Sequence, residues 1–203
     1  MYRTRVLIPF RGQFHFYVNI HRFVYRLRLP PTHPSAIHPC LLNAVYLAAC
    51  SVIGGTSMVM HEQVFLNRTR QACERSLAYA DRLVHFMWAN VILASYYLRA
   101  GRVVEAHSTI GSTVRFAVGA GLHLGDTTME VVQVQDTNSL ALPPADPIDG
   151  EERIHLWWAL TMCEAAISLG AGLPSSAPVE VGCFFFFYGD GNLEQTKLLQ
   201  PFF

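Results

Sequence analysis

The sixteen residues between Arg82 and Arg99 carry no formal charge, and this stretch constrains the fold more than any other feature of the chain. Aromatic and aliphatic side chains crowd it, among them Trp88, Ile92 and Tyr97. No glycine or proline interrupts it. Because a helix at the surface normally carries a polar face, a helix this apolar must be buried. The pattern predicts the central helix of the fold over about residues 83–100.

Four further segments have helical patterning. Pro39 is a favoured first-turn residue for one of them, and glycines mark the ends of several. Asp149 and Glu152, three residues apart before an apolar run, predict a capping box with Asp149 as the cap. The link at Gly101 is so short that the helices on either side form an antiparallel hairpin. The four segments span about residues 39–53, 62–81, 103–118 and 149–169.

The predicted fold class is therefore all-α, a bundle of antiparallel helical hairpins with about five main helices. We divide the chain into a basic, irregular N-terminal segment (1–34), a helical domain (35–178) and an atypical tail (179–203). The tail holds four consecutive phenylalanines and then a glycine-rich stretch, which in isolation predicts a short strand and a turn over 183–192. Residues 126–147 predict a long polar loop.

Composition limits the classes of function. The chain has 203 residues, 51% of them hydrophobic, which is enough for one globular domain with a core. Fifteen basic and fifteen acidic residues give zero net charge, which argues against the whole chain being a nucleic-acid-binding surface. The five cysteines have no metal-ligand spacing, so neither a disulfide framework nor a cysteine-type zinc site is indicated, and a reducing, intracellular compartment is expected.

The charges are unevenly distributed. Residues 1–61 contain six arginines and no acid, and the first carboxylate is Glu62. Such a segment is consistent with a mitochondrial transit peptide, although these are usually rich in serine and the first serine here is Ser35. The alternative is a basic segment that leads into the helical domain.

The sequence lacks a recognisable catalytic constellation. His61-Glu62 begins like the zinc-protease helix signature, but Phe65 stands where the second histidine ligand is needed. Glu164 is the one charge within the apolar run of the last helix, and a buried carboxylate needs a partner. It is a candidate effector contact. The structural alternatives are an ion pair with Arg115 or exposure to solvent. We expect no enzymatic activity, no cofactor and no bound metal.

Several segments together resemble a known family. The first is Ser35-Ala-Ile-His-Pro-Cys-Leu-Leu-Asn-Ala-Val-Tyr-Leu-Ala-Ala-Cys50. Others are Tyr97-Leu-Arg-Ala-Gly-Arg-Val-Val-Glu-Ala106, Arg115-Phe-Ala-Val-Gly-Ala-Gly-Leu-His123, and Glu152-Arg153 followed by Trp157-Trp158. In this order and spacing they resemble the fungal-specific transcription factor domain, the middle regulatory region of zinc binuclear cluster activators. The resemblance covers about residues 14–178.

The resemblance assigns a set of signature residues with structural roles. They are His38, Pro39, Gly101, Arg102, Glu105, Ala106, Arg115, Gly121, Leu122, His123, Glu152, Arg153, Trp157, Trp158 and Pro174. The acidic-basic pair that the family usually has in the last of these helices is Glu164-Ala165 here, so its basic member is missing.

The resemblance implies a nuclear, all-α regulatory domain that modulates transcription through contacts of its helical body. Its partners would be other transcription-regulatory proteins or a second copy of itself, with no membrane. The family's six-cysteine zinc cluster is absent, so zinc and DNA binding are expected only in a segment outside this chain. We therefore expect a fragment of such a regulator. The alternatives are a helical small-ligand enzyme and a mitochondrial or membrane-associated helical protein.

Overall fold

The structure is a computed structural model, and it describes residues 8–53, 56–123 and 144–176. These residues contain helices and no strand, which confirms the all-α prediction. The expected strand at 183–192, the tail over 179–203 and most of the expected loop over 126–147 lie outside the described residues. The helices are η1 (Ile8–Phe14), α2 (Ile20–Arg26), α3 (Pro39–Ile53), α4 (Thr56–Ala78), α5 (Leu83–Arg99), α6 (Val103–Gly119) and α8 (Pro147–Ala171).

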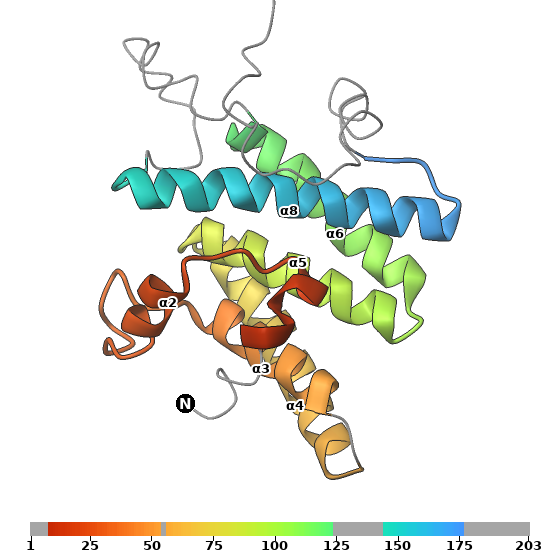
Figure 1. Ribbon diagram of the computed structural model, residues 1–203, viewed down its shortest axis with the longest axis horizontal. Coiled ribbons are helices and arrows are strands. Elements are labelled where there is room, and N and C mark those ends of the chain that lie inside the picture. Colours follow the sequence, from red (N-terminus) through yellow and green to blue (C-terminus); the bar gives the residue numbers. More distant parts are fainter. Residues whose placement is uncertain (1–7, 54–55, 124–143, 177–203) are drawn as a thin grey trace, which may run out of the picture.

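The helices pack as hairpins around α5 (Figure 1). Helix α3 packs against α4 and α5, while α6 packs against α5 and α8. Helix α8 lies across α5 and α6, on the side away from the α3–α4 hairpin. Helix α5 thus contacts α3, α4, α6, α8 and η1, which confirms its prediction as the central helix.

The core explains why α5 can be almost entirely apolar. Trp88, Met87 and Ile92 are fully buried, and the Trp88 ring meets the edge of Phe16 with ring centroids 5.5 Å apart. The buried Ser95 hydroxyl of α5 donates to the Val91 carbonyl at 2.9 Å. A helix buried on all sides needs such internal bonds because water cannot satisfy its polar groups.

The N-terminal segment departs from the prediction. An irregular segment was expected over residues 1–34, but η1 and α2 occupy much of it. Asn19 caps α2 by accepting from the Arg22 amide at 3.1 Å. Phe14, Phe16 and Phe23 are buried in the same core as α3 and α5. The expectation of an irregular segment is therefore wrong for these residues, because their aromatic side chains join the main core.

Two predicted helix starts are also wrong. Helix α4 begins at Thr56 rather than near residue 62. Helix α8 begins at Pro147 with Asp146 as its N-cap, which accepts from the Asp149 amide at 2.8 Å. Asp149 in turn accepts from the Ala145 amide at 3.1 Å. The capping box therefore lies three residues earlier than the Asp149–Glu152 pair that the sequence suggested.

The turn between α4 and α5 forms without glycine or proline. Ala80 and Arg82 adopt left-handed backbone conformations, with φ of 50° and 47°. Non-glycine residues rarely do so, and the surrounding contacts must hold them there. Ser76 donates to the Asp81 carbonyl at 2.6 Å, and Arg82 donates to the Ala36 carbonyl at 2.9 Å. These bonds tie the turn to the end of α4 and to the segment that precedes α3.

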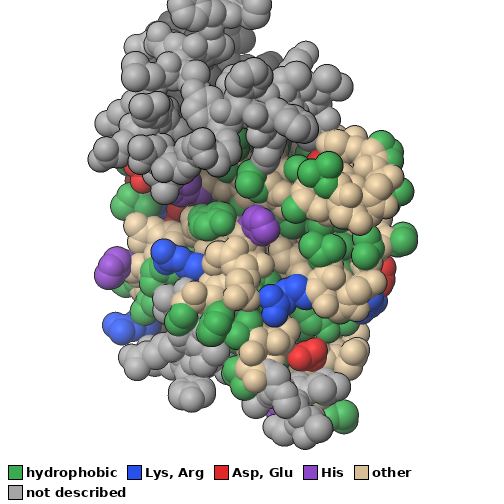
Figure 2. All heavy atoms as spheres, turned by 45° about the vertical axis from the view of Figure 1, so that its right-hand side comes forward, with side chains coloured by type: hydrophobic (Ala, Val, Ile, Leu, Met, Phe, Trp, Pro, Cys, Tyr) green, Lys and Arg blue, Asp and Glu red, His purple; other side chains and the backbone are tan. Residues whose placement is uncertain are grey.

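Helix α8 also presents an exposed apolar stripe. Trp158, Met162 and Leu169 lie on one side of the helix and are all exposed. Helix α8 is long and apolar enough to cross a membrane by length and composition, but half of its apolar window is buried, as in many core helices. In the face drawn in Figure 2, apolar side chains are scattered among a few separate arginines and histidines, with no continuous patch of one charge.

Candidate functional site

A cleft of about 610 Å³ lies between α2, the segment that precedes α3, the start of α5 and the start of α8. We call it the α2–α8 cleft. Its apolar wall includes Phe23, Leu83 and Trp88. Its polar wall includes Arg26, His85 and Glu152. Clefts of this size that combine apolar walls with a few polar groups are typical sites for small molecules.

The first turns of α8 bring acidic groups to this cleft. The Pro147 start and the Asp146 cap fix the helix terminus, and Asp149 and Glu152 follow within two turns. Arg22 reaches from α2 and donates to Asp146 Oδ1 at 2.6 Å. The hydrogen bond from Arg22 lowers the pKa of Asp146. Arg153 donates to Asp149 Oδ2 at 3.1 Å, one turn along the same helix.

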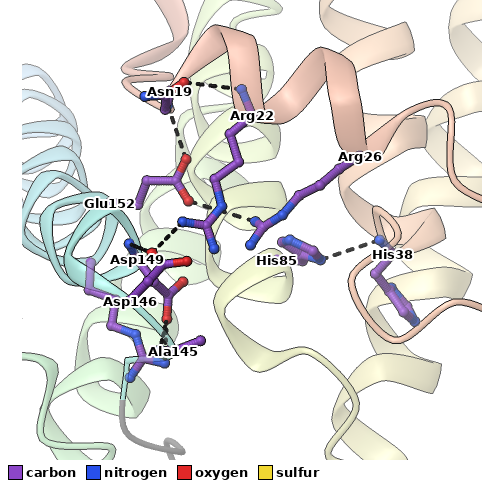
Figure 3. A network of polar contacts seen from close by, with 10 residues as sticks. Asn19, Arg22, Arg26, His38, His85, Ala145, Asp146, Asp149 and Glu152 are labelled. Carbon is purple, nitrogen blue, oxygen red and sulfur yellow. Dashed lines mark hydrogen bonds and ion pairs between the residues drawn. The ribbon is translucent and has the colours of Figure 1, made fainter.

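Glu152 is the centre of the contact between α2 and α8 (Figure 3). It is 8% exposed, and its Oε1 accepts from the Asn19 backbone amide at 3.1 Å. Its Oε2 lies 3.7 Å from Arg26 Nη1, which is an ion pair but too long for a hydrogen bond. Burial raises the pKa of Glu152, and burial together with the Arg22 charge lowers the pKa of Arg26. For both groups the charged form therefore costs free energy. We call the contact between Arg26 and Glu152 the open pair.

His85 borders the open pair from α5. Its Nδ1 accepts from the His38 backbone amide at 3.3 Å. Burial, reinforced by the charges of Arg26 and Arg82, lowers the pKa of His85 to about 3. The ring is therefore neutral near pH 7, and because Nδ1 accepts, the proton sits on Nε2. In Figure 3 the ring lies beside the Arg26 side chain.

The pair of Arg82 and Asp81, which also lines the cleft, is closed. Arg82 donates from Nε and Nη2 to the two carboxylate oxygens of Asp81, both at 2.9 Å. The hydrogen bonds from Arg82 lower the pKa of Asp81. A bidentate pair of this kind satisfies both groups. Among the described residues, three arginine–carboxylate pairs line the cleft, and the open pair is the one of these three without a direct hydrogen bond.

The structure brings together only part of the signature set. Glu152 and Arg153 line the cleft, and His38 contacts His85 behind it. The remaining signature residues lie away from the cleft, at helix ends, in packing positions or, for Arg115 and Trp158, on the surface. They are Pro39, Gly101, Arg102, Glu105, Ala106, Arg115, Gly121, Leu122, His123, Trp157, Trp158 and Pro174.

The distant signature residues have identifiable structural roles. Gly101 and Gly121 have φ of 72° and 77°, the left-handed region that glycine tolerates best. Arg102 pairs with Glu105 one turn on and stacks over the Tyr97 ring at 4.7 Å. Ala106 is fully buried where α6 meets the core. Together they shape the α5–α6 hairpin.

Trp157 and Trp158 are neighbours with different environments. Trp157 is buried and its ring centroid lies 6.0 Å from that of His123, whereas Trp158 is exposed. The Pro174 carbonyl lies 3.1 Å from His107 Nε2, which ties the end of α8 to α6.

Glu164 is neither exposed nor, among the described contacts, ion-paired with Arg115. It is 1% exposed and accepts three hydrogen bonds. The donors are the hydroxyls of Ser168 at 3.0 Å and Ser175 at 2.8 Å, and the Ser176 amide at 2.6 Å. Both structural alternatives in the sequence analysis are therefore wrong. Its partners are neutral, and Glu164 lies outside the α2–α8 cleft.

The described cysteines are buried. They are Cys40, Cys50, Cys73 and Cys163. Burial raises the pKa of the Cys163 thiol to about 11, and it also raises that of Cys40. Such thiols are poor nucleophiles at neutral pH because the thiolate is the reactive form. Among the described residues, no group of three or more potential ligands could hold a metal ion.

The sequence predicted no role for Arg26 and His85, which line the cleft, or for Arg22, which pairs with Asp146 next to it. One signal was present, because Arg22 and Arg26 are four residues apart and would share one face of a helix. His85 gave no signal, since a lone histidine in an apolar run is usually a packing residue.

Comparison with protein-family models, curated proteins and solved structures finds no match to this chain.

Proposed function

We propose that the chain is part of the regulatory domain of a transcription regulator, of the type that the fungal-specific domain represents. It acts in the nucleus through noncovalent contacts of its helical body, and a segment outside this chain reads the DNA. The domain binds other regulatory proteins or a second copy of itself. It catalyses no reaction and needs no cofactor of its own.

The observation that carries the proposal is the position of the signature residues within the helical hairpins. Gly101 and Gly121 stand at positive φ at helix ends, and the Arg102–Glu105 pair opens α6. Residues with these roles define a scaffold rather than a reaction centre. A scaffold of packed hairpins with a cleft large enough for a small molecule suits a domain that acts by changing its contacts with partners.

A reporter assay tests the proposal. The full chain is fused to a heterologous DNA-binding domain, and expression is measured from a promoter carrying the cognate site. We expect a change of at least severalfold relative to the DNA-binding domain alone. The W88A fusion, which removes a fully buried core side chain, serves as the control and should lose the effect. Equal expression from all three proteins would contradict the proposal.

The cellular location of the full chain distinguishes the proposal from the mitochondrial alternative. A fluorescent protein is attached at the C-terminus so that the acid-free N-terminal segment stays free. We expect nuclear fluorescence. Accumulation in mitochondria would instead assign the six arginines of residues 1–61 to a transit peptide.

A further inference from the structure

The open pair is the unusual feature of the α2–α8 cleft. A buried ion pair is stabilising only when its geometry is good and its hydrogen bonds are made. Arg26 and Glu152 lie too far apart for a direct hydrogen bond, although both are mostly buried. Arg26 forms no side-chain hydrogen bond with any described residue, and Glu152 Oε2 forms none either. A positive and a negative group thus face the cleft with unused hydrogen-bonding capacity.

A group that bridges the two charges must itself be dipolar. It needs an acceptor for the Arg26 guanidinium and a donor for the Glu152 carboxylate. His85 adds a second donor on the Arg26 side, because its Nδ1 is engaged by His38 and its Nε2–H has no acceptor among the described residues. A simple anion would be repelled by Glu152, and a simple cation would be repelled by Arg26.

The distance between Arg26 and Glu152 determines how far apart the two charges of a ligand should lie. Arg26 Nη1 and Glu152 Oε2 are 3.7 Å apart. No group fits between atoms this close, but a ligand can lie beside them and contact both from the cleft. The carboxylate and ammonium groups of an α-amino acid are joined through one carbon, so their spacing matches that of the pair. An ω-amino acid holds the two groups several bonds apart and matches it less well.

The rest of the cleft suits an apolar side chain. Phe23, Leu83 and Trp88 line it, and its volume of about 610 Å³ exceeds what the charged groups alone need. We infer that the α2–α8 cleft binds a free α-amino acid with a large apolar side chain, its carboxylate on Arg26 and His85 and its ammonium on Glu152. This binding site follows from the cleft and goes beyond the proposed role in transcription.

Isothermal titration calorimetry on the full chain tests the inference, with L-phenylalanine and L-leucine as probes. We expect saturable binding of at least one of them at pH 7. Phenethylamine, which lacks the carboxylate, and 3-phenylpropionate, which lacks the ammonium, should each bind at least about tenfold more weakly, since each loses a charged hydrogen bond. No binding of either amino acid, or equal binding of the one-charge analogues, would overturn the inference.

Matched arginine variants locate the site. R26Q should weaken binding of the amino acid at least about tenfold. R28Q removes an exposed arginine two residues away, outside the cleft, and should bind as the unaltered chain does. E152Q serves as the second variant if R26Q does not fold, and it should weaken binding to a similar extent. Equal affinities of R26Q, E152Q and R28Q would place the ligand elsewhere. This readout is independent of the transcription assay.

Discussion

Helix α8 carries two buried carboxylates, and each finds partners for its charge in a different way. Glu164 is enclosed by two serine hydroxyls and an amide, all within twelve residues of it. Glu152 instead accepts from an amide 133 residues away and faces Arg26 across 3.7 Å. The first site is local and complete. The second joins distant elements and leaves hydrogen-bonding capacity unused at the edge of a cleft.

The difference teaches that burial alone does not identify a functional carboxylate. Glu164 is the more buried of the two, and the sequence pattern had made it the candidate effector contact. Its three hydrogen bonds leave little capacity for bonds to a ligand. Its role is therefore to hold the end of α8 to the turn that follows. Glu152 is partly satisfied, and the pKa shifts of Glu152 and Arg26 both run toward the neutral forms. A ligand in the cleft could therefore supply hydrogen bonds that Glu152 lacks.

The largest effect is expected for Glu164. E164A removes the acceptor of three hydrogen bonds, one of them from the buried Ser168 hydroxyl, and we expect the free energy of unfolding to fall by about 3 kcal/mol. Urea denaturation at pH 7 measures this value. E151A, which truncates an exposed glutamate on the same helix, is the control and should change stability by less than about 0.5 kcal/mol. Similar losses in the two variants would contradict the structural role of Glu164.

The next effect concerns pH. The pKa of His85 is about 3 in the folded protein, against an ordinary value of 6.5. As the pH falls below 6.5 the unfolded chain binds a proton at this residue and the folded protein does not, so stability falls between about pH 6.5 and pH 3. For one proton the slope is about 1.4 kcal/mol per pH unit.

The variant H85N isolates this contribution. Asparagine keeps an acceptor that can reach the His38 amide but cannot titrate. We expect the stability of H85N to depend less steeply on pH than that of the unaltered chain, by about 1.4 kcal/mol per unit. Urea denaturation at pH 6, 5 and 4 measures both slopes. Parallel slopes would mean that His85 is not held neutral beside the open pair.

A smaller effect tests the hydrogen bonds of Glu164 individually. S168A removes one of its three donors from a buried position, and we expect a loss of about 1 kcal/mol in the free energy of unfolding. S112A is the matched control, because the Ser112 hydroxyl is exposed and bonds only to a carbonyl of its own helix. A stability of S168A equal to that of S112A would show that two donors suffice.

The smallest effect on stability is expected for Glu152. Burial raises the pKa of Glu152 above its ordinary 4.5, so its stabilising contribution is present at low pH and is lost as the pH rises through the raised pKa. At pH 7 the charge is a net cost. E152Q keeps an acceptor for the Asn19 amide, and we expect its unfolding free energy to equal or exceed that of the unaltered chain within about 0.5 kcal/mol. A loss of 2 kcal/mol or more in urea denaturation would contradict this.

The sequence predicted elements whose determinants are local. Helix α5 followed from its uncharged apolar run, and the α5–α6 hairpin followed from Gly101. The α4–α5 turn could not be placed, because Ala80 and Arg82 adopt positive φ where Ser76 donates to the Asp81 carbonyl and Arg82 donates to the Ala36 carbonyl. The open pair could not be predicted from the sequence either, since it joins residues from the two ends of the described chain. The burial of Phe14, Phe16 and Phe23 was not predicted, because the segment that contains them was interpreted from its arginines.

Urea denaturation of E152Q and E164A, each with and without 10 mM L-phenylalanine, tests the contrast between the two carboxylates most directly. A ligand that binds only the folded state raises the unfolding free energy. We predict that E152Q keeps its stability but loses the increment from the amino acid, whereas E164A loses about 3 kcal/mol and keeps that increment. If E152Q is destabilised as E164A is, or if E152Q retains the full increment, the assignment of the two carboxylates is wrong.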